Sequence, residues 1–198
     1  MQMKKTIKMT MKDIDTGRKK VLDNARDLVQ DAQILLAKRR YARAFFLAQI
    51  AVEELGKYIM LISCAMQVAY GNVDWQDFWK RFRHHKEKIT NLVHSEYFFF
   101  SDEPPVEYIN KILELAKTQE EVKLLALYAD YDGKTFSKPI EEIDKTTAEQ
   151  AVALAKRRVN WIKEYDKKII GTDALYRLTK EKVEDFYKRI GITEFIER

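Results

Sequence analysis

The stretch Tyr41–Tyr70, YARAFFLAQIAVEELGKYIMLISCAMQVAY, decides the fold that we expect. Its segment 44–52 is apolar except for Gln49. A helix that is apolar almost all round is buried among other elements. We therefore predict a central helix over 41–70, ended by the Gly-Asn pair at 71–72, within an all-α bundle of long antiparallel helices.

Periodic segments on both sides of this helix predict the rest of the bundle. Apolar residues recur three and four positions apart in the segments 15–40, 106–117, 148–169 and 172–190, and the segment 75–99 is aromatic at its start and basic in its middle. The 198 residues include only six glycines and three prolines. Alternating strand patterns bounded by such turn residues are almost absent, which argues against an all-β fold.

Turn and capping residues mark the expected boundaries. The Asp-Gly pair at 132–133 is a turn signal between aromatic residues, and it predicts a small hairpin or an ordered loop near 124–139. Thr146 or Thr147 is expected to open the helix over 148–169. The side chains expected to face inward from that helix are Ala151, Leu154, Ala155, Val159 and Ile162.

The chain is expected to form one domain. No linker rich in glycine, proline or serine divides it, so we predict a flexible N-terminus over 1–14 followed by a single helical domain over 15–198. The formal net charge is +5, from 36 basic and 31 acidic residues. Since both signs are plentiful, the position of the cations matters more than their sum.

Cysteine usage and hydropathy bear on location. Cys64 lies in an apolar run and is expected to be a buried structural thiol. A single cysteine allows no internal disulfide, and the N-terminus shows no apolar signal region, so we expect a cytoplasmic protein. Glu53, Glu54 and Lys57 interrupt the longest apolar stretch, so we expect no membrane partner.

The central helix carries an unusual carboxylate. On a helical projection Glu54 lies about 20° from Leu47, on the apolar stripe, while Glu53 points elsewhere, towards Lys57. A buried carboxylate needs a partner, so Glu54 is either half of a structural ion pair or part of a polar site with Lys57. Gly56 costs about 1 kcal/mol inside a helix, which is usually tolerated where another backbone or a ligand comes close.

A basic run forms the second candidate site. The segment 80–88, KRFRHHKEK, holds five strong cations and two histidines, and aromatic residues precede it. Cations beside aromatics suit phosphate contact and base stacking, but the rings at helical spacing are equally explained as core and the charges as a solvated face. His84 and His85 cannot face the same way on one helix. The residues that we assign to RNA or phosphate binding are Lys80, Arg81, Arg83 and Lys88.

The segment 124–134, LLALYADYDGK, is the third candidate. Asp130 and Asp132 could cap a turn or bind a cation, although an Asp-Gly pair beside aromatics is most simply a structural turn. We group Tyr128 and Asp130 with Glu54 and Lys57 as a predicted buried polar site or interface. No set of His, Cys, Asp and Glu has a recognisable ligand spacing, so we predict no metal and no cofactor.

Three segments, in order, resemble the AbiV-type abortive-infection proteins of bacterial phage defence, which belong to the HEPN superfamily of small helical domains associated with nucleotides or RNA. The apolar run over 42–57 that closes in EELGK looks like their signature helix. The segment 75–88 is similar to their Trp-rich segment that ends in His-Lys-x-Lys, and 127–139 is similar to their Leu-Tyr-x-Asp-Tyr segment. The resemblance implies a homodimeric helical core and a role in abortive infection.

Many HEPN domains are also metal-independent ribonucleases with an Arg-x4–6-His motif. Arg81 and Arg83 precede His85 by only four and two positions, while Lys80 has the right interval but is the wrong residue. If the chain cleaves RNA, we assign the general acid or base to His85. Two functions therefore stay open: a dimeric effector engaged by a phage-encoded protein, and an effector that binds or cleaves RNA or ribonucleoprotein.

Overall fold

The computed structural model describes residues 7–69, 71–100, 118, 121–131, 133–169 and 177, with the backbone alone for 97–100. The predicted helix over 106–117 lies outside these residues, as does the predicted helix over 172–190 apart from Arg177. The described part confirms an all-α antiparallel bundle with one small hairpin.

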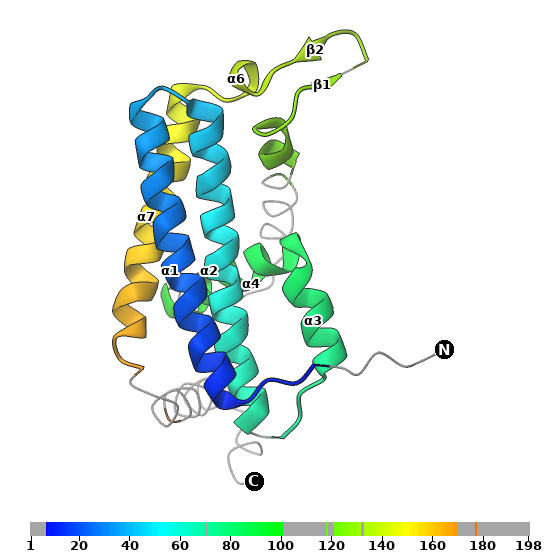
Figure 1. The fold of residues 1–198 in the computed structure, drawn as a ribbon, viewed down its shortest axis with the longest axis vertical. Helices are drawn as coiled ribbons and strands as arrows, with labels where there is room; N and C mark the ends of the chain where they lie inside the picture. Colours follow the sequence, from blue (N-terminus) through cyan, green and yellow to red (C-terminus); the bar gives the residue numbers. More distant parts are fainter. Residues whose placement is uncertain are drawn as a thin grey trace.

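Three long helices form the centre of the bundle. They are α1 (Met11–Ala37), α2 (Tyr41–Ala69) and α7 (Lys145–Asp166), which lie side by side in Figure 1. Helix α2 contacts α1, α4 and α7, which confirms its prediction as the central helix. Small side chains on the facing surfaces, such as Ala25, Ala51 and Ala155, let the helices approach closely.

Helix α1 begins and ends earlier than its apolar stripe predicts. Thr10 and Asp13 form a reciprocal capping box, so the helix starts at Met11 and not at Asp15. It ends at Ala37 instead of Arg40, because Arg39 adopts a left-handed conformation with φ +57°. The tight turn at this residue reverses the chain into α2.

The predicted single helix over 75–99 is wrong, because the structure has two. Helix α3 (Trp75–Arg83), capped by Asp74 as the cap preference of Asp would suggest, ends at His84, whose ψ of 125° is extended. Helix α4 (His85–Phe100) then starts in a new direction. The break lets the aromatic residues of α3 pack against the start of α1 and the second half of α2, while α4 runs across the back of α2 in Figure 1.

The hairpin near 124–139 is confirmed. Strand β1 (Asp130–Tyr131) pairs antiparallel with β2 (Phe136–Ser137), and Gly133 turns the chain with φ +97°. One helical turn, α6 (Pro139–Glu142), follows, which the sequence did not predict. Figure 1 shows the hairpin and α6 at the end of the bundle where α1 turns into α2.

Helix α7 is capped by a different residue from the predicted threonines. The side chain of Asp144 accepts a hydrogen bond from the Thr147 backbone at 2.7 Å, so the helix begins at Lys145. Of the side chains predicted to face inward, Ala155, Val159 and Ile162 are buried, whereas Ala151 and Leu154 are half-buried. Of the helices in the part of the chain that the structure describes, none is long and apolar enough to cross a membrane.

Candidate functional site

A buried carboxylate on α2, Glu53, is the centre of the polar site. Its side chain is 4% exposed and contacts groups from two other segments. Oε1 lies 2.5 Å from Nζ of Lys123, in the helical turns over 121–125, while Oε2 lies 2.5 Å from Nδ1 of His85 and 3.6 Å from Nζ of Lys88 on α4. Glu53 therefore joins α2 to two elements that follow it in the chain.

The charge state of Glu53 follows from these partners. Burial alone would raise its pKa, but hydrogen bonds with Lys123 and His85, and the charges of both, hold the pKa below its ordinary value of 4.5. Glu53 is thus an ionised carboxylate, which can only accept hydrogen bonds. In this contact Nδ1 of His85 therefore donates to Glu53, and Nε2 is the ring nitrogen outside the contact.

The ring of His85 is accessible, since its side chain is 49% exposed. A histidine that is held at one ring nitrogen by a buried carboxylate and is open at the other has the arrangement of a general acid or base. The geometry thus fixes the orientation of the ring of the predicted catalytic residue. His84, the cap residue of α3, is also exposed and does not join this cluster.

The two lysines beside Glu53 are not part of the exposed basic face. The side chains of Lys88 and Lys123 are each 7% exposed. Burial lowers the pKa of Lys88, and the attraction of Glu53 opposes that shift. Lys88, which we assigned to phosphate binding, therefore lies inside the cluster, while Lys80 and Arg83 are exposed to solvent.

Gly56 is needed where α4 crosses α2. A Cβ at this position would lie 2.1 Å from the backbone oxygen of Lys88, which is far inside van der Waals contact. The close backbone approach predicted from the unusual helical glycine is thus confirmed. This close approach of α4 to α2 also brings Lys88 and His85 within reach of Glu53.

The pairing of the neighbouring glutamate differs from the sequence expectation. Lys57 pairs with Glu54, three residues before it, and not with Glu53. Nζ of Lys57 also lies 6.0 Å from the centre of the Phe82 ring. Both glutamates are buried, and Glu53 is covered by α4 and by the turns over 121–125.

Tyr128 and Asp130 lie apart from this cluster. Both are exposed, and Asp130 accepts a hydrogen bond from the backbone of Tyr131 within the hairpin. Among the described residues, no hydrogen bond or ion pair joins either of them to Glu54 or Lys57. The structure therefore divides the predicted buried polar site into an ion pair on α2 and an exposed hairpin.

The aromatic residues of α3 pack against the protein. Phe78 stacks on Phe82 at 5.3 Å between ring centroids, and Trp75 and Trp79 meet Phe78 edge to face. Their cluster includes Ile14 and Cys64, and the indole nitrogen of Trp79 donates to the backbone of Ile7 at 2.7 Å. These rings are explained as core and not as a surface for base stacking.

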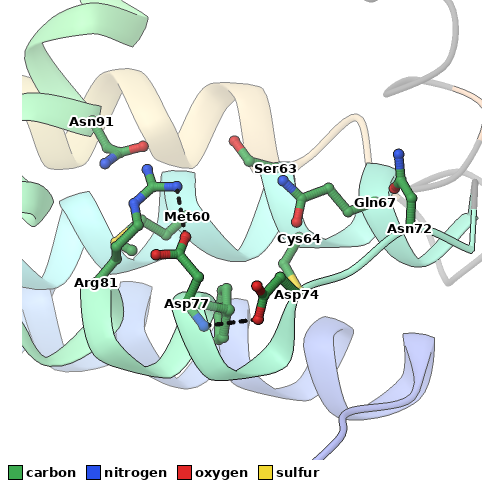
Figure 2. A pocket seen from close by; sticks show the side chains of 10 residues that line it. Met60, Ser63, Cys64, Gln67, Asn72, Asp74, Asp77, Arg81 and Asn91 are labelled. Carbon is green, nitrogen blue, oxygen red and sulfur yellow. Dashed lines mark hydrogen bonds and ion pairs between the residues drawn. The ribbon is translucent and has the colours of Figure 1, made fainter.

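A small polar pocket lies where α2, α3 and α4 meet, with a volume of about 140 Å³. Figure 2 shows Arg81 beside Asn91, with Ser63 and Gln67 on the α2 side. Arg81 pairs with Glu87 at 3.2 Å and lies 3.7 Å from Asp77. Part of the charge of Arg81 is therefore neutralised within the protein, whereas no ion pair joins Lys80 or Arg83 to another described residue.

Glu53 and Lys123 are the residues of this site that sequence reasoning missed. Lys123 precedes the buried Ala126 by three positions, so a helical stripe through Ala126 contains it. That signal is weak, because it spans a single turn. No group of three or more His, Cys, Asp and Glu side chains in the described ranges could hold a metal ion.

The structure is an antiparallel helical bundle in which the buried carboxylate of Glu53 contacts the exposed ring of His85. The family model of AbiV, a HEPN family, matches residues 13–160. The chain belongs to this family, and membership implies a role in abortive infection as a defence against phage. No curated protein and no solved structure matches the chain.

Proposed function

We propose that this chain is a homodimeric effector of abortive infection that a phage-encoded protein engages, and that this engagement blocks phage propagation. The family supplies the defence role. The observation that carries the proposal is an exposed apolar surface at one end of the bundle. Surfaces of this kind are typical of protein–protein contact.

We call this region the hairpin surface. It consists of Leu124, Tyr128, Tyr131, Phe136 and Ile140, whose exposed fractions run from 50% to 77%. The rings of Tyr131 and Phe136 are 5.0 Å apart across the hairpin. Aromatic residues gathered on a projecting element provide the anchors that dominate binding energy in protein interfaces. The position of the hairpin at the end of the bundle leaves it accessible (Figure 1).

The test is the double substitution Tyr131→Ser/Phe136→Ser. Both side chains are exposed, so thermal stability should change little, whereas protection against phage and co-purification with a phage-encoded protein should be lost. Ile34→Ser is the matched control, since Ile34 is equally exposed on α1 outside the hairpin surface. Full protection by the double variant would overturn the proposal. Sedimentation of the purified chain tests the dimer.

A second function, action on RNA, is favoured by a different observation, the contact between Glu53 and His85. An oriented imidazole could serve as general acid or base in metal-independent cleavage, with Lys80 and Arg83 contacting phosphate and Arg81 beside them. Phosphate contacts by these cations would make RNA binding weaken steeply with salt.

The test of the second function uses total cellular RNA in EDTA. Cleavage that is lost in His85→Ala, and salt-sensitive binding that is lost in Lys80→Glu/Arg83→Glu, would support it. His84→Ala is the control, because His84 is exposed but lies outside the Glu53 cluster. If the unmodified chain neither cleaves RNA nor binds it in a salt-sensitive way, engagement by a phage-encoded protein remains as the only one of the two proposed functions.

A further inference from the structure

The segment 121–128 lies between the hairpin surface and the buried cluster around Glu53. The chain continues from its helical turns into strand β1, and Figure 1 shows these turns next to the hairpin, beside α2. Leu124 and Tyr128, which belong to the hairpin surface, are exposed, whereas Lys123 and Ala126 are buried. Helical residues three or four positions apart lie on one face. The segment therefore presents one face to solvent and the other to the protein.

Backbone hydrogen bonds hold these two faces together. The N–H groups of Leu127 and Tyr128 both donate to the carbonyl oxygen of Leu124 at 3.0 Å. Lys123 lies in the helical turn that Leu124 continues. A partner that displaces Leu124 and Tyr128 is therefore expected to displace Lys123 as well.

Few contacts hold the inner face of the segment. The small side chain of Ala126 packs with Ala42 and Phe45 at the start of α2. The other buried side chain is that of Lys123, whose Nζ lies 2.5 Å from Oε1 of Glu53. The cost of taking two charges out of water offsets much of their attraction in a buried ion pair. Withdrawal of Lys123 into water is therefore expected to cost little free energy.

Lys123 and His85 share the carboxylate of Glu53. Nδ1 of His85 donates to Oε2 at 2.5 Å, and Nζ of Lys123 lies 3.4 Å from the same Nδ1. Since both nitrogens donate to Glu53, their approach to each other brings two donors together and gains no hydrogen bond. If Lys123 withdraws, Glu53 keeps His85 and Lys88 as partners. The contact between Glu53 and His85 should then strengthen, because fewer donors share the carboxylate.

We propose that Lys123 couples the hairpin surface to His85, so that a partner bound to the outer face of 121–128 withdraws Lys123 from Glu53 and tightens the contact between Glu53 and His85. The coupling rests on the proposed function, because it takes the hairpin surface as the place where a partner binds. It adds what that binding changes inside the chain, namely the hold on an accessible imidazole. The segment 121–128 is the element whose position both sites influence.

The first experiment uses the unmodified full chain, with single-domain antibody fragments in place of the phage-encoded protein. Fragments are selected for binding that is lost in Tyr128→Ser, and a fragment whose binding is lost in Ile34→Ser is the control. The ring signals of His85, assigned by their loss in His85→Ala, are followed by NMR. We expect the fragments on the hairpin surface to shift the His85 signals and to leave those of His84, outside the cluster, in place. Unchanged His85 signals at saturation, or an equal shift with the control fragment, would overturn the proposal.

The second experiment removes the charge that carries the coupling. Lys123→Met keeps an unbranched apolar stem, and Glu53 keeps His85 as its partner. In this variant the same fragments should lose at least about half of their effect on the His85 signals. Lys123→Arg keeps the cation and should retain most of the effect, as should Lys145→Met, which removes an exposed lysine on α7. An undiminished shift in Lys123→Met would contradict the role of Lys123.

The outcome is separable from that of the proposed function. Because the fragments replace the phage-encoded protein, the NMR result does not depend on which protein engages the chain in the cell. Absence of coupling would leave the hairpin surface as a binding site without an effect on His85. Full protection by Tyr131→Ser/Phe136→Ser would refute the proposed function and leave the coupling measured with the fragments intact.

Discussion

Gly56 and Gly17 both lie inside helices but have different surroundings, and each leads to a prediction. A Cβ on Gly56 would meet the Lys88 backbone at 2.1 Å, so Gly56→Ala must push α2 and α4 apart. We expect a loss of about 1–3 kcal/mol in the free energy of unfolding, measured with urea.

Gly17→Ala is the matched control for that substitution. Its Cβ would lie at an ordinary 3.4 Å from a methyl group of Leu61, at the flexible end of a side chain. Since alanine favours helix by about 1 kcal/mol over glycine, Gly17→Ala should be neutral or stabilising. Equal stability changes for the two variants would contradict the close approach of α4 at Gly56.

Arg18 is a fully buried cation, and its sequence position gives only weak evidence of that burial. It lies on the inner stripe of α1 between Ile14 and Leu22, and it pairs with Asp15 and with Asp166 of α7. The hydroxyl group of Tyr58 donates to the same Asp166 at 2.8 Å. One network therefore ties α1, α2 and the end of α7 together.

We expect Arg18→Met to destabilise the chain by about 3–5 kcal/mol, because it leaves the carboxylate of Asp166 without its main cation in a buried network. Arg26→Met is the control, since the pair of Arg26 with Asp23 is exposed and should contribute at most about 1 kcal/mol. Thermal and urea unfolding of both variants measures the difference. A loss as small as that of the control would show that Asp166 finds another partner.

At the scale of the helices, the docking of α4 on α2 should depend on pH through Glu53. Its pKa in the folded chain lies below 4.5, so the unfolded chain binds more protons than the folded one in this range. The stability that Glu53 contributes is therefore present above pH 4.5 and is lost as the pH falls through the lower pKa of the folded state. Amide hydrogen exchange of α4 measures this local stability.

Glu53→Gln should remove that part of the acid dependence and weaken protection of α4 at neutral pH, because it leaves Lys88 and Lys123 buried without a negative charge. Glu164→Gln is the control, since Glu164 lies at the end of α7 and pairs with the exposed Lys167 that follows the helix. Protection of α4 that falls equally with acid in Glu53→Gln would assign the effect to another carboxylate.

The helix boundaries show which features apolar periodicity predicts and which it does not. The central helix over 41–69 ends within one residue of its predicted range, because a helix that is buried on all sides is apolar along most of its length. The ends of α1 and α7 are set by capping at Thr10 and Asp144, which apolar spacing does not report. The break at His84 has no glycine or proline, so only packing against two different surfaces explains it.

At the scale of the whole molecule, the rate of chemical modification of Cys64 measures how often the bundle unfolds. The thiol is buried in the cluster beneath α3, and burial raises its pKa to about 11. We expect a thiol reagent at neutral pH to modify Cys64 at least about 100-fold more slowly than an exposed cysteine, with a rate that rises with urea as the bundle unfolds. Gln67→Cys in a Cys64→Ala background is the exposed reference. Fast modification in the absence of urea would mean that α3 opens by itself.

The sequence by itself determined that the chain is helical, that α2 is central, that a hairpin or an ordered loop interrupts the helices near 124–139, and that the chain resembles the AbiV family. These follow from apolar periodicity, turn residues and motifs, which are local in the chain. Only the tertiary structure decided that Glu53, not Glu54, meets His85 and Lys123, and that Tyr128 and Asp130 stay exposed. The physical reason is that the partners of a buried charge depend on which helices pack together. Glu53 lies 32 positions from His85 and 70 positions from Lys123, and the periodicity of one helix says nothing of contacts between residues so far apart.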